Sequence, residues 1–356
     1  MPSQRPERST TKRGSATRSR LTSRDIALAA GVSQATVSNV LNRPEIVAPE
    51  TLKRVNDVIE SMNFVVNDSA RTLRAGHSRA LGVIALDLSN PFWGEVTRGI
   101  EATASQLGYS VLLGSSEEKL DKETRLLRLF EENRVEGILV SSVDIGSETL
   151  ATLYEHGMKV VLLDQPDPAG TYSSVSLDQV QGARLAAQHL LEQGHRRIAF
   201  INIPHSVSWS RDRLQGLSEG IAAAGLDPAE VITEITIESM TAHAAEPAVE
   251  TLLAGSPDVT AVLCANDMVA LGVLKQLSER GVTVPRDLSV VGFDDSYFAS
   301  MLSPALTTVR QHPFELGQTA AEMIIKATDG VVPESVLFDP ELIVRQSVRN
   351  LTSAAG

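Results

Sequence analysis

Side chains that could hydrogen-bond to DNA bases gather at the start of one short predicted helix. Gln34 and Asn39 each carry an amide, which can pair with adenine through two hydrogen bonds. Both project away from the apolar positions Val37, Val40 and Leu41, which predict the inward face of the helix. The first turn of a helix also directs backbone N–H groups toward phosphate. The stretch is therefore a candidate for major-groove recognition, although short helices of this kind also occur in ordinary protein cores.

The residues before this helix predict its partner in a helix-turn-helix. Thr22 can cap a first helix, and Asp25 follows three residues later in a capping-box-like position. Gly31 supplies a tight turn because it has no side chain, and Ser33 can cap the second helix. Three apolar residues at helical spacing predict the inward face of the first helix: Ile26, Ala29 and Ala30.

A short basic segment, Asn67–Arg74, follows a third predicted helix. It is too short to be a stable helix alone, because isolated helices under about 12 residues are marginal in water. Two copies docked on DNA could support one another. Leu73 would then be an apolar wedge for a minor-groove step, with Arg71 and Arg74 at nearby phosphates. The alternative is a plain linker with one buried leucine.

The charge of the chain is unevenly distributed. The net charge is −12, yet residues 1–79 carry a net +6 and the remainder a net −18. Such asymmetry is typical of a chain with one nucleic-acid-binding end. Residues 1–20 are rich in Ser, Thr, Arg and Pro, which predicts a disordered basic tail.

From Leu81 onward, short apolar runs alternate with amphipathic segments. This alternation predicts doubly wound parallel α/β sheets in two lobes. Helices are expected near residues 93–107, 121–133, 147–156, 178–193, 211–224, 241–254, 266–280 and 314–327. The predicted strands are Leu81–Leu86, Val111–Leu113, Gly137–Val140, Val160–Leu163, Ile198–Ile201, Ala261–Cys264 and Leu288–Val291.

Polar and aromatic residues follow several of these predicted strands. Ligands of such sheets bind at the carboxyl ends of strands, so these residues are candidates for a small-molecule site. Singly, each has a structural alternative, such as a helix cap for an aspartate or a core position for an aromatic ring. Together, carboxylates, amides, an arginine and flat rings suit a sugar. The candidates are Asn90, Phe92, Trp93, Asp164, Gln165, Trp209, Arg213, Asn266, Asp294 and Gln311.

Motifs for catalysis are absent from the sequence. It contains no phosphate-cradling loop ending in Lys-Ser or Lys-Thr and no Gly-x-Ser-x-Gly elbow. The seven histidines do not pair at metal-ligand spacing, and Cys264 is the sole cysteine. We therefore expect no enzyme, no metal and no cofactor. No apolar run reaches the roughly 18 residues of a membrane span, and no signal peptide is evident, so a cytoplasmic, nucleoid-associated protein is expected.

The string Ala30–Asn42 resembles the headpiece of the LacI/GalR family of transcriptional regulators, and the resemblance continues through Val47–Thr51, Phe64 and Asn67–Arg74. It implies base contacts from Gln34, Ala35 and Asn39. It implies phosphate contacts from Ser33, Thr36, Ser38, Asn42 and Thr51. It further implies that Leu73 is the hinge wedge and that Ala70 allows the two hinge helices to approach closely. The sequence departs from the family at two positions: the family often has Arg in place of Asn39, and Ala35 offers only a methyl contact.

Residues 80–350 resemble the effector domain of the same family, which is similar to bacterial sugar-binding transport proteins. The matches are Ala265–Gly272, Val290–Asp295 and Leu306–Val309, while Asn90–Trp93 looks like the ribose-binding type. The resemblance implies that eight of the ten candidates line a cleft between the lobes: Asn90, Phe92, Trp93, Asp164, Arg213, Asn266, Asp294 and Gln311. Gln165 departs from the pattern because the ribose type tends to have a second arginine there.

These features predict a DNA-binding repressor, working as a homodimer on a pseudo-palindromic operator and controlled by a small molecule, most readily a sugar. Alternatives are a purine or protein effector in the same family, and a solute-binding protein. The expected divisions are a tail (1–20), a headpiece (21–66), a hinge helix and linker (67–79), a two-lobed effector and dimerisation domain (80–350) and a tail (351–356).

Overall fold

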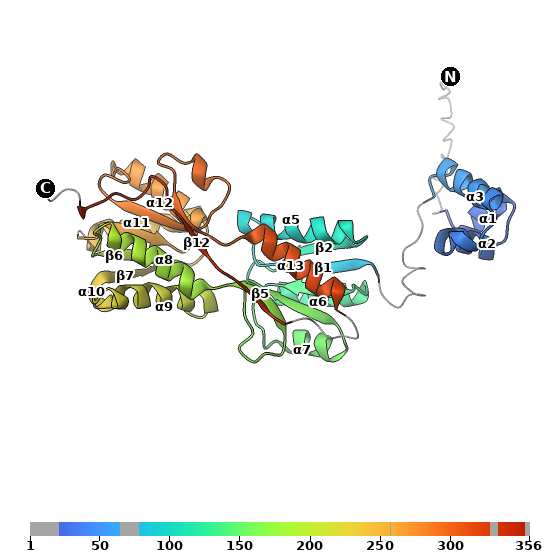
Figure 1. The fold of residues 1–356 in the computed structure, drawn as a ribbon, viewed down its shortest axis with the longest axis horizontal. Coiled ribbons are helices and arrows are strands. Elements are labelled where there is room, and N and C mark those ends of the chain that lie inside the picture. Colours follow the sequence, from blue (N-terminus) through green and yellow to red (C-terminus); the bar gives the residue numbers. More distant parts are fainter. Residues whose placement is uncertain (1–20, 65–77, 257, 328–333, 353–356) are drawn as a thin grey trace, which may run out of the picture. The chain divides into compact units, whose positions relative to one another are not determined.

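A computed structural model describes residues 21–64, 78–256, 258–327 and 334–352 (Figure 1). The chain divides into two compact units, residues 1–74 and 75–356. The hinge residues Ala70, Arg71, Leu73 and Arg74 lie outside the described residues, as does the side chain of Asn42.

The first unit is a small helical domain. It comprises α1 (Ser23–Ala30), α2 (Gln34–Asn42), the 3₁₀ helix η1 (Pro44–Ile46) and α3 (Pro49–Ser61). The predicted capping box is confirmed, because the Thr22 backbone N–H donates to Asp25 Oδ2 over 2.8 Å. Gly31 ends α1 with a φ of 65°, and Ser33 Oγ accepts from the Thr36 N–H over 3.0 Å to cap α2. Local sequence therefore fixes both ends of the turn.

The core of this domain corrects one prediction. Ile26, Val37 and Val55 are fully buried where the three helices meet. Ala27 is buried with them, whereas Ala29 is exposed. The reason is that α1 packs against both α2 and α3, and this widens its buried face from Ile26 toward Ala27 and away from Ala29.

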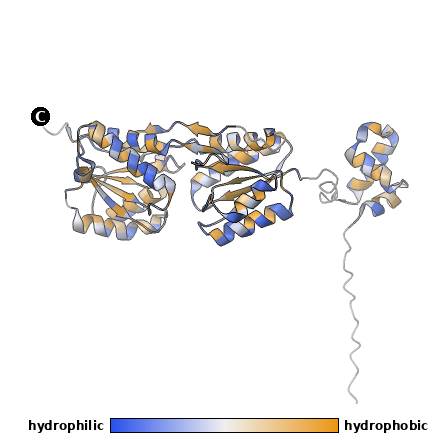
Figure 2. Ribbon diagram, turned by 90° about the horizontal axis from the view of Figure 1, so that it is seen from below, coloured by the Kyte–Doolittle hydropathy of each residue, from blue (hydrophilic) through white to orange (hydrophobic). Residues whose placement is uncertain are grey.

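The second unit has two lobes, each a six-stranded sheet between helices (Figures 1 and 2), which confirms the predicted α/β fold class. The sheet of lobe 1 has the order β11-β5-β4-β3-β1-β2 and that of lobe 2 the order β12-β10-β9-β8-β6-β7. All strand pairs are parallel except β10 with β12. Parallel pairing brings the carboxyl ends of neighbouring strands to one edge of each sheet.

Lobe 1 contains β1 (Ala80–Ala85), α5 (Pro91–Gln106), β2 (Ser110–Ser115), α6 (Leu120–Glu132), β3 (Gly137–Val140), α7 (Glu148–Glu155), β4 (Lys159–Leu163), β5 (Ser173–Leu177), α13 (Pro313–Lys326) and β11 (Val336–Phe338). Lobe 2 contains α8 (Gln179–Glu192), β6 (Ile198–Asn202), α9 (Ser208–Ala223), α10 (Pro228–Val231), β7 (Ile232–Thr236), η2 (Ala242–Ala244), α11 (Ala245–Gly255), β8 (Ala261–Cys264), α12 (Asp267–Glu279), β9 (Ser289–Asp294), η3 (Ala299–Met301), β10 (Thr307–Arg310) and β12 (Glu341–Ile343). Among the described helices, none is both long and apolar enough to cross a membrane.

The chain passes between the lobes three times: from β5 to α8, from β10 to α13 and from β11 to β12. The first and third passages touch, because the Asp178 N–H donates to the Phe338 carbonyl over 3.0 Å. Gln179 begins α8 directly after the first passage, and Gln311 lies within the second. Both glutamines are therefore placed between the lobes by the topology.

Candidate functional site

Two carboxylates stand at strand ends in opposite lobes. Asp164 follows β4 in lobe 1, and Asp294 ends β9 in lobe 2. Both residues have positive φ, 53° for Asp164 and 116° for Asp294. L-residues seldom adopt this backbone region, and such strain is concentrated at functional sites because the surrounding structure must impose it. The strained backbone thus fixes the direction of both carboxylates, and the packing of the two sheets has to offset the free energy of this strain.

The side chain of Gln179 joins these lobes. Its Nε2 donates to Asp164 Oδ1 over 3.1 Å and to Gln311 Oε1 over 3.4 Å. Its Oε1 accepts from Arg213 Nε over 2.8 Å. Asp164 belongs to lobe 1 and Arg213 to α9 of lobe 2, so a single amide connects an acid and a base on the two sides.

Asp294 extends the same network from lobe 2. Gln311 Nε2 donates to its Oδ1, and the Asn90 side chain approaches it from lobe 1. Asn90 is held in place because its Oδ1 caps α5, accepting from the Phe92 N–H over 3.0 Å. Asp294 Oδ2 is buried and has no hydrogen-bond partner among the described residues. A buried carboxylate oxygen is an acceptor that a bound donor could satisfy.

Arg213 is the cation of the network and is almost completely buried. Its guanidinium lies 3.7 Å from the ring centre of Phe293 and 4.7 Å from that of Trp209. It also donates to the carbonyl of Ala265. These contacts fix the plane of the guanidinium and cover one face of each ring.

Burial changes the acidity of all three charged groups. It raises the pKa of Asp164 to about 7, although the positive charge of Arg213 opposes the change. It raises the pKa of Asp294 to about 6, again against Arg213. It lowers the pKa of Arg213, while Asp294 and Asp164 act in the opposite direction. Perturbed acids of this kind, converging from two lobes, are typical of a binding site.

Asp267 holds neighbouring elements of lobe 2 together next to the site. It begins α12, where its Oδ2 accepts from the Ser296 N–H and its Oδ1 from Thr308 Oγ1, both over 2.7 Å. Burial raises its pKa well above the usual value. A Cβ on Gly292 would lie 2.1 Å from Asp267 Oδ1, so β9 and α12 approach this closely only because residue 292 is glycine. The contacts tie the ends of β9 and β10 to α12.

The structure places the ten predicted small-molecule residues in different surroundings. Asn90, Asp164, Arg213, Asp294 and Gln311 join the network, and Trp209 lies against Arg213. The other four make local contacts. Gln165 Oε1 accepts from the Ser142 N–H over 3.2 Å, Asn266 Oδ1 caps α12 at Val269, and Phe92 and Trp93 pack edge to face at 5.0 Å in the core of lobe 1.

Gln179 and Asp267 are site residues that the sequence prediction did not include. The sequence could have indicated Asp267, because it follows a predicted strand directly after Asn266. The sequence could not have indicated Gln179, because β5, the strand before it, is too polar to be recognised as a strand.

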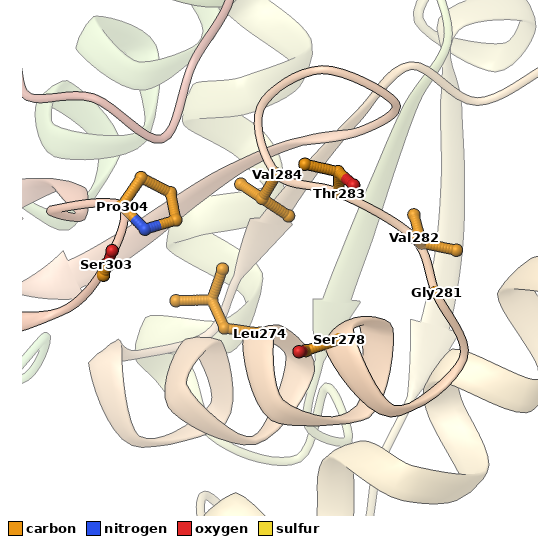
Figure 3. A pocket seen from close by; sticks show the side chains of 8 residues that line it. All are labelled: Leu274, Ser278, Gly281, Val282, Thr283, Val284, Ser303 and Pro304. Carbon is orange, nitrogen blue, oxygen red and sulfur yellow. The ribbon is translucent and has the colours of Figure 1, made fainter.

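The pocket in Figure 3 lies elsewhere in lobe 2. It is bounded by α12, by the loop after this helix and by the turn at Ser303 and Pro304. None of the ten predicted residues lines it.

The predicted DNA-contact residues lie along α2 and near the start of α3. Gln34, Ala35 and Asn39 are exposed on α2, and Ser33 is exposed at its cap. Thr36, Ser38 and Thr51 are half-buried. The amides thus stand on the outer face of α2, opposite its contacts with α1 and α3.

An exposed amide-bearing helix in a helix-turn-helix, together with a two-lobed α/β domain, defines a DNA-binding protein that carries a sensor. Residues 22–67 match the family described as bacterial regulatory proteins, lacI family, and residues 187–348 match the periplasmic binding protein-like domain. The HTH-type transcriptional repressor PurR of Photobacterium profundum is 31% identical over 334 residues, which are 93% of this chain and 99% of the relative. The chain belongs to the LacI family and is a DNA-binding transcriptional regulator.

Solved structures agree over almost the whole chain. The Lac repressor dimer bound to operator and the anti-inducer ONPF has a TM-score of 0.81 and 27% identity, over 92% of this chain and 99% of that one. The complex of the transcriptional regulator CelR with cellobiose has a TM-score of 0.68 and 29% identity, over 92% of this chain and 100% of that one. The similar curated proteins are transcriptional regulators, in agreement with the prediction that this chain is not an enzyme.

Proposed function

We propose that this regulator is a repressor that reads a pseudo-palindromic operator as a homodimer and responds to an uncharged sugar bound between the lobes. The observation that carries the proposal is the buried network of Asp164, Arg213 and Asp294, which spans both lobes. A ligand that binds groups on both lobes favours the arrangement of the lobes in which it makes more contacts, and so shifts the equilibrium between the two arrangements.

The chemistry of the network favours hydroxyl groups. A sugar hydroxyl can donate to a carboxylate and accept from a guanidinium, and the unsatisfied Asp294 Oδ2 needs a donor. The similar solved structure of the regulator CelR is a complex with cellobiose. Sugar recognition therefore agrees with both the site residues and a related structure.

Charge argues against an anionic effector. Asp164, Asp294 and Asp267 face a single buried cation, Arg213. Above about pH 7, where Asp164 and Asp294 are ionised, a phosphate or carboxylate would add further negative charge beside these two acids. A purine is also less well supported, because Arg213 covers one face of Phe293 and of Trp209, where a flat base would otherwise stack.

The headpiece is proposed to place α2 in the major groove, with Gln34, Ala35 and Asn39 at the bases and Ser33, Thr36, Ser38, Asn42 and Thr51 at phosphates. The boundaries 21–66, 67–79 and 80–350 and the hinge wedge Leu73 remain part of this proposal, on the strength of the sequence. Effector binding would act on the operator through the spacing of the two hinge segments. A coupling of about 1–3 kcal/mol is typical of such linkage.

The direct test selects bound duplexes from a random pool at low ionic strength, with and without a panel of neutral sugars, sugar phosphates and purines. We expect an inverted repeat to be enriched and one neutral sugar to change its recovery. Thermal shift with the same panel identifies the binder independently of DNA. If no duplex is enriched, the DNA-binding part fails; if only a phosphate or a purine acts, the assignment of the effector fails.

Replacing Asn39 with alanine is expected to weaken operator binding roughly tenfold and to relax base preference at one position of each half-site. The exposed Asn39 amide is lost, while the core of the headpiece is untouched. Asn56→Ala is the matched control, because Asn56 is exposed on α3 of the same domain. Titration of a selected duplex with each variant measures the effect. An equal loss in both variants would contradict a base contact by Asn39.

Effector affinity is expected to rise with pH and to level off above about pH 8. The pKa values of about 7 for Asp164 and about 6 for Asp294 mean that both acids are largely protonated near pH 5 and ionised near pH 8. Hydroxyl donors bind the ionised form better.

The free energy of unfolding without effector should change in the opposite direction, falling as the pH rises. The folded pKa values exceed the unfolded value of 3.8, so the free energy of unfolding falls between about pH 4 and 7.

Calorimetric titration and urea unfolding over this pH range check both trends. Effector affinity that is independent of pH would show that the carboxylates do not contact the ligand.

A further inference from the structure

Gln179 uses both donors and the oxygen of its amide between the lobes. A primary amide has two N–H donors and one oxygen. Here both donors are engaged, one with Asp164 and one with Gln311, and the oxygen accepts from Arg213. The side chain is only 4% exposed. The amide is therefore a buried connector with defined partners on each side.

The backbone holds this amide at the junction. Asp178 caps α8 through a hydrogen bond from the Gln181 N–H to its Oδ1 over 2.8 Å, and its own N–H is bonded to Phe338 of the third passage. Gln179 is thus the first residue of a helix whose start is anchored to two interlobe passages. Its side chain cannot leave its partners without a change in rotamer or a separation of the lobes.

The pattern of its contacts matches what a sugar hydroxyl would do. The amide donates to Asp164 on lobe 1 and accepts from Arg213 on lobe 2. A hydroxyl is also a donor and an acceptor, so it would form the same two bonds with the same two groups. We infer that Gln179 is a clasp between the lobes, which makes with Asp164 and Arg213 the bonds that the effector takes over.

This inference rests on the proposed effector site and adds a residue to it. The clasp stabilises the contact between the lobes, and an effector has to displace it before it can use Asp164 and Arg213. Gln179 therefore sets both the closure of the lobes and the affinity for the effector. A shorter or apolar side chain at this position would leave the acid and the base without their connector.

An isosteric variant separates a clasp from simple packing. Gln179→Glu keeps the size and shape of the side chain but replaces its donor nitrogen with an oxygen. At pH 8, where Asp164 is ionised, the new carboxylate faces another carboxylate across the lobes. A clasp would open, because it loses its bond to Asp164 and gains a repulsion across the lobes. Gln179→Ala tests the same point without a new charge.

The test measures the distance between the lobes in the full chain with no sugar added. Cys264 is fully buried in β8, so spin labels attach selectively to introduced cysteines. Glu155→Cys on α7 and Ala222→Cys on α9 place one label on an exposed position of each lobe. Mixing with excess unlabelled protein leaves one labelled chain in each assembly. Pulsed electron spin resonance then gives the distance distribution.

We expect Gln179→Glu and Gln179→Ala to lengthen and broaden the interlobe distance relative to the parent protein. Gln181→Ala is the matched control, because Gln181 lies on the same helix and its side-chain oxygen accepts from Arg184 outside the network. It should leave the distance unchanged. Unchanged distances in both Gln179 variants would overturn the clasp, as would an equal change in the control. Since no sugar is used, this result stands whether or not the panel yields an effector.

Discussion

Replacing Asp294 with asparagine is expected to lower effector affinity by about 100-fold, the loss typical of removing charge-assisted hydrogen bonds. The asparagine amide keeps the size of the side chain and tolerates the positive φ of 116° at this position. What it removes is the negative charge and the buried acceptor oxygen Oδ2. Operator affinity without effector should stay unchanged, because the headpiece is a separate compact unit.

Calorimetric titration with the effector and duplex titration without it measure the two quantities. Asp287→Asn is the control, since Asp287 is an exposed acid of the same lobe that pairs with Arg286. Equal effector affinity in Asp294→Asn and in the parent protein would remove Asp294 from the binding site. Loss of operator binding in the absence of effector would instead assign Asp294 a role in the folding of lobe 2.

The strands of the sheet centres could be predicted from sequence because they are apolar throughout. Gly137–Val140 and Ala261–Cys264 have the same bounds in the sequence prediction and in the structure. Helices cover both faces of such strands, so their side chains are buried on both sides and are apolar. Their ends could then be located, and with them Asp164, Asp294 and Arg213 as candidates.

Other strands lacked this signal. Ser173–Leu177 contains three serines, and Ile232–Thr236 is an edge strand with three polar residues among its five. Their pairing is decided by neighbouring strands rather than by their own hydrophobicity. The omission extended to function, because Gln179 is placed by the strand that was not predicted.

Strand-end position alone also does not determine which residues meet. Gln165 and Asn266 both follow predicted strands, yet each side-chain oxygen is used locally, by the Ser142 N–H and by the first turn of α12. A helix cap and a ligand contact require the same residue types, so composition cannot distinguish them. Only the three-dimensional arrangement separates Asp164 and Asp294 from their neighbours.

Helix contacts through glycine determine that arrangement, and they give the second large prediction. In lobe 2, a Cβ on Gly216 of α9 would lie 2.0 Å from the Val180 carbonyl oxygen of α8. Val180 follows Gln179, and Gly216 lies about one helical turn after Arg213. The close approach of the two helices at this glycine therefore brings Arg213 within bonding distance of Gln179. In lobe 1, Gly99 of α5 and Gly317 of α13 make equivalent contacts with Phe314 and Val96.

Gly216→Ala is expected to destabilise the effector domain by about 2–3 kcal/mol and to weaken effector binding, because the obstructing atom is backbone and the helices must separate. Gly94→Ala is a matched control with the opposite sign. No atom lies within 4 Å of a Cβ on Gly94, so this variant should gain about 0.5–1 kcal/mol from helix propensity alone. The two tryptophans, Trp93 and Trp209, both lie in the effector domain, and their fluorescence during urea unfolding reports on it selectively. Equal stabilisation of both variants would show that α8 and α9 can separate without loss, and that the glycine does not position Arg213.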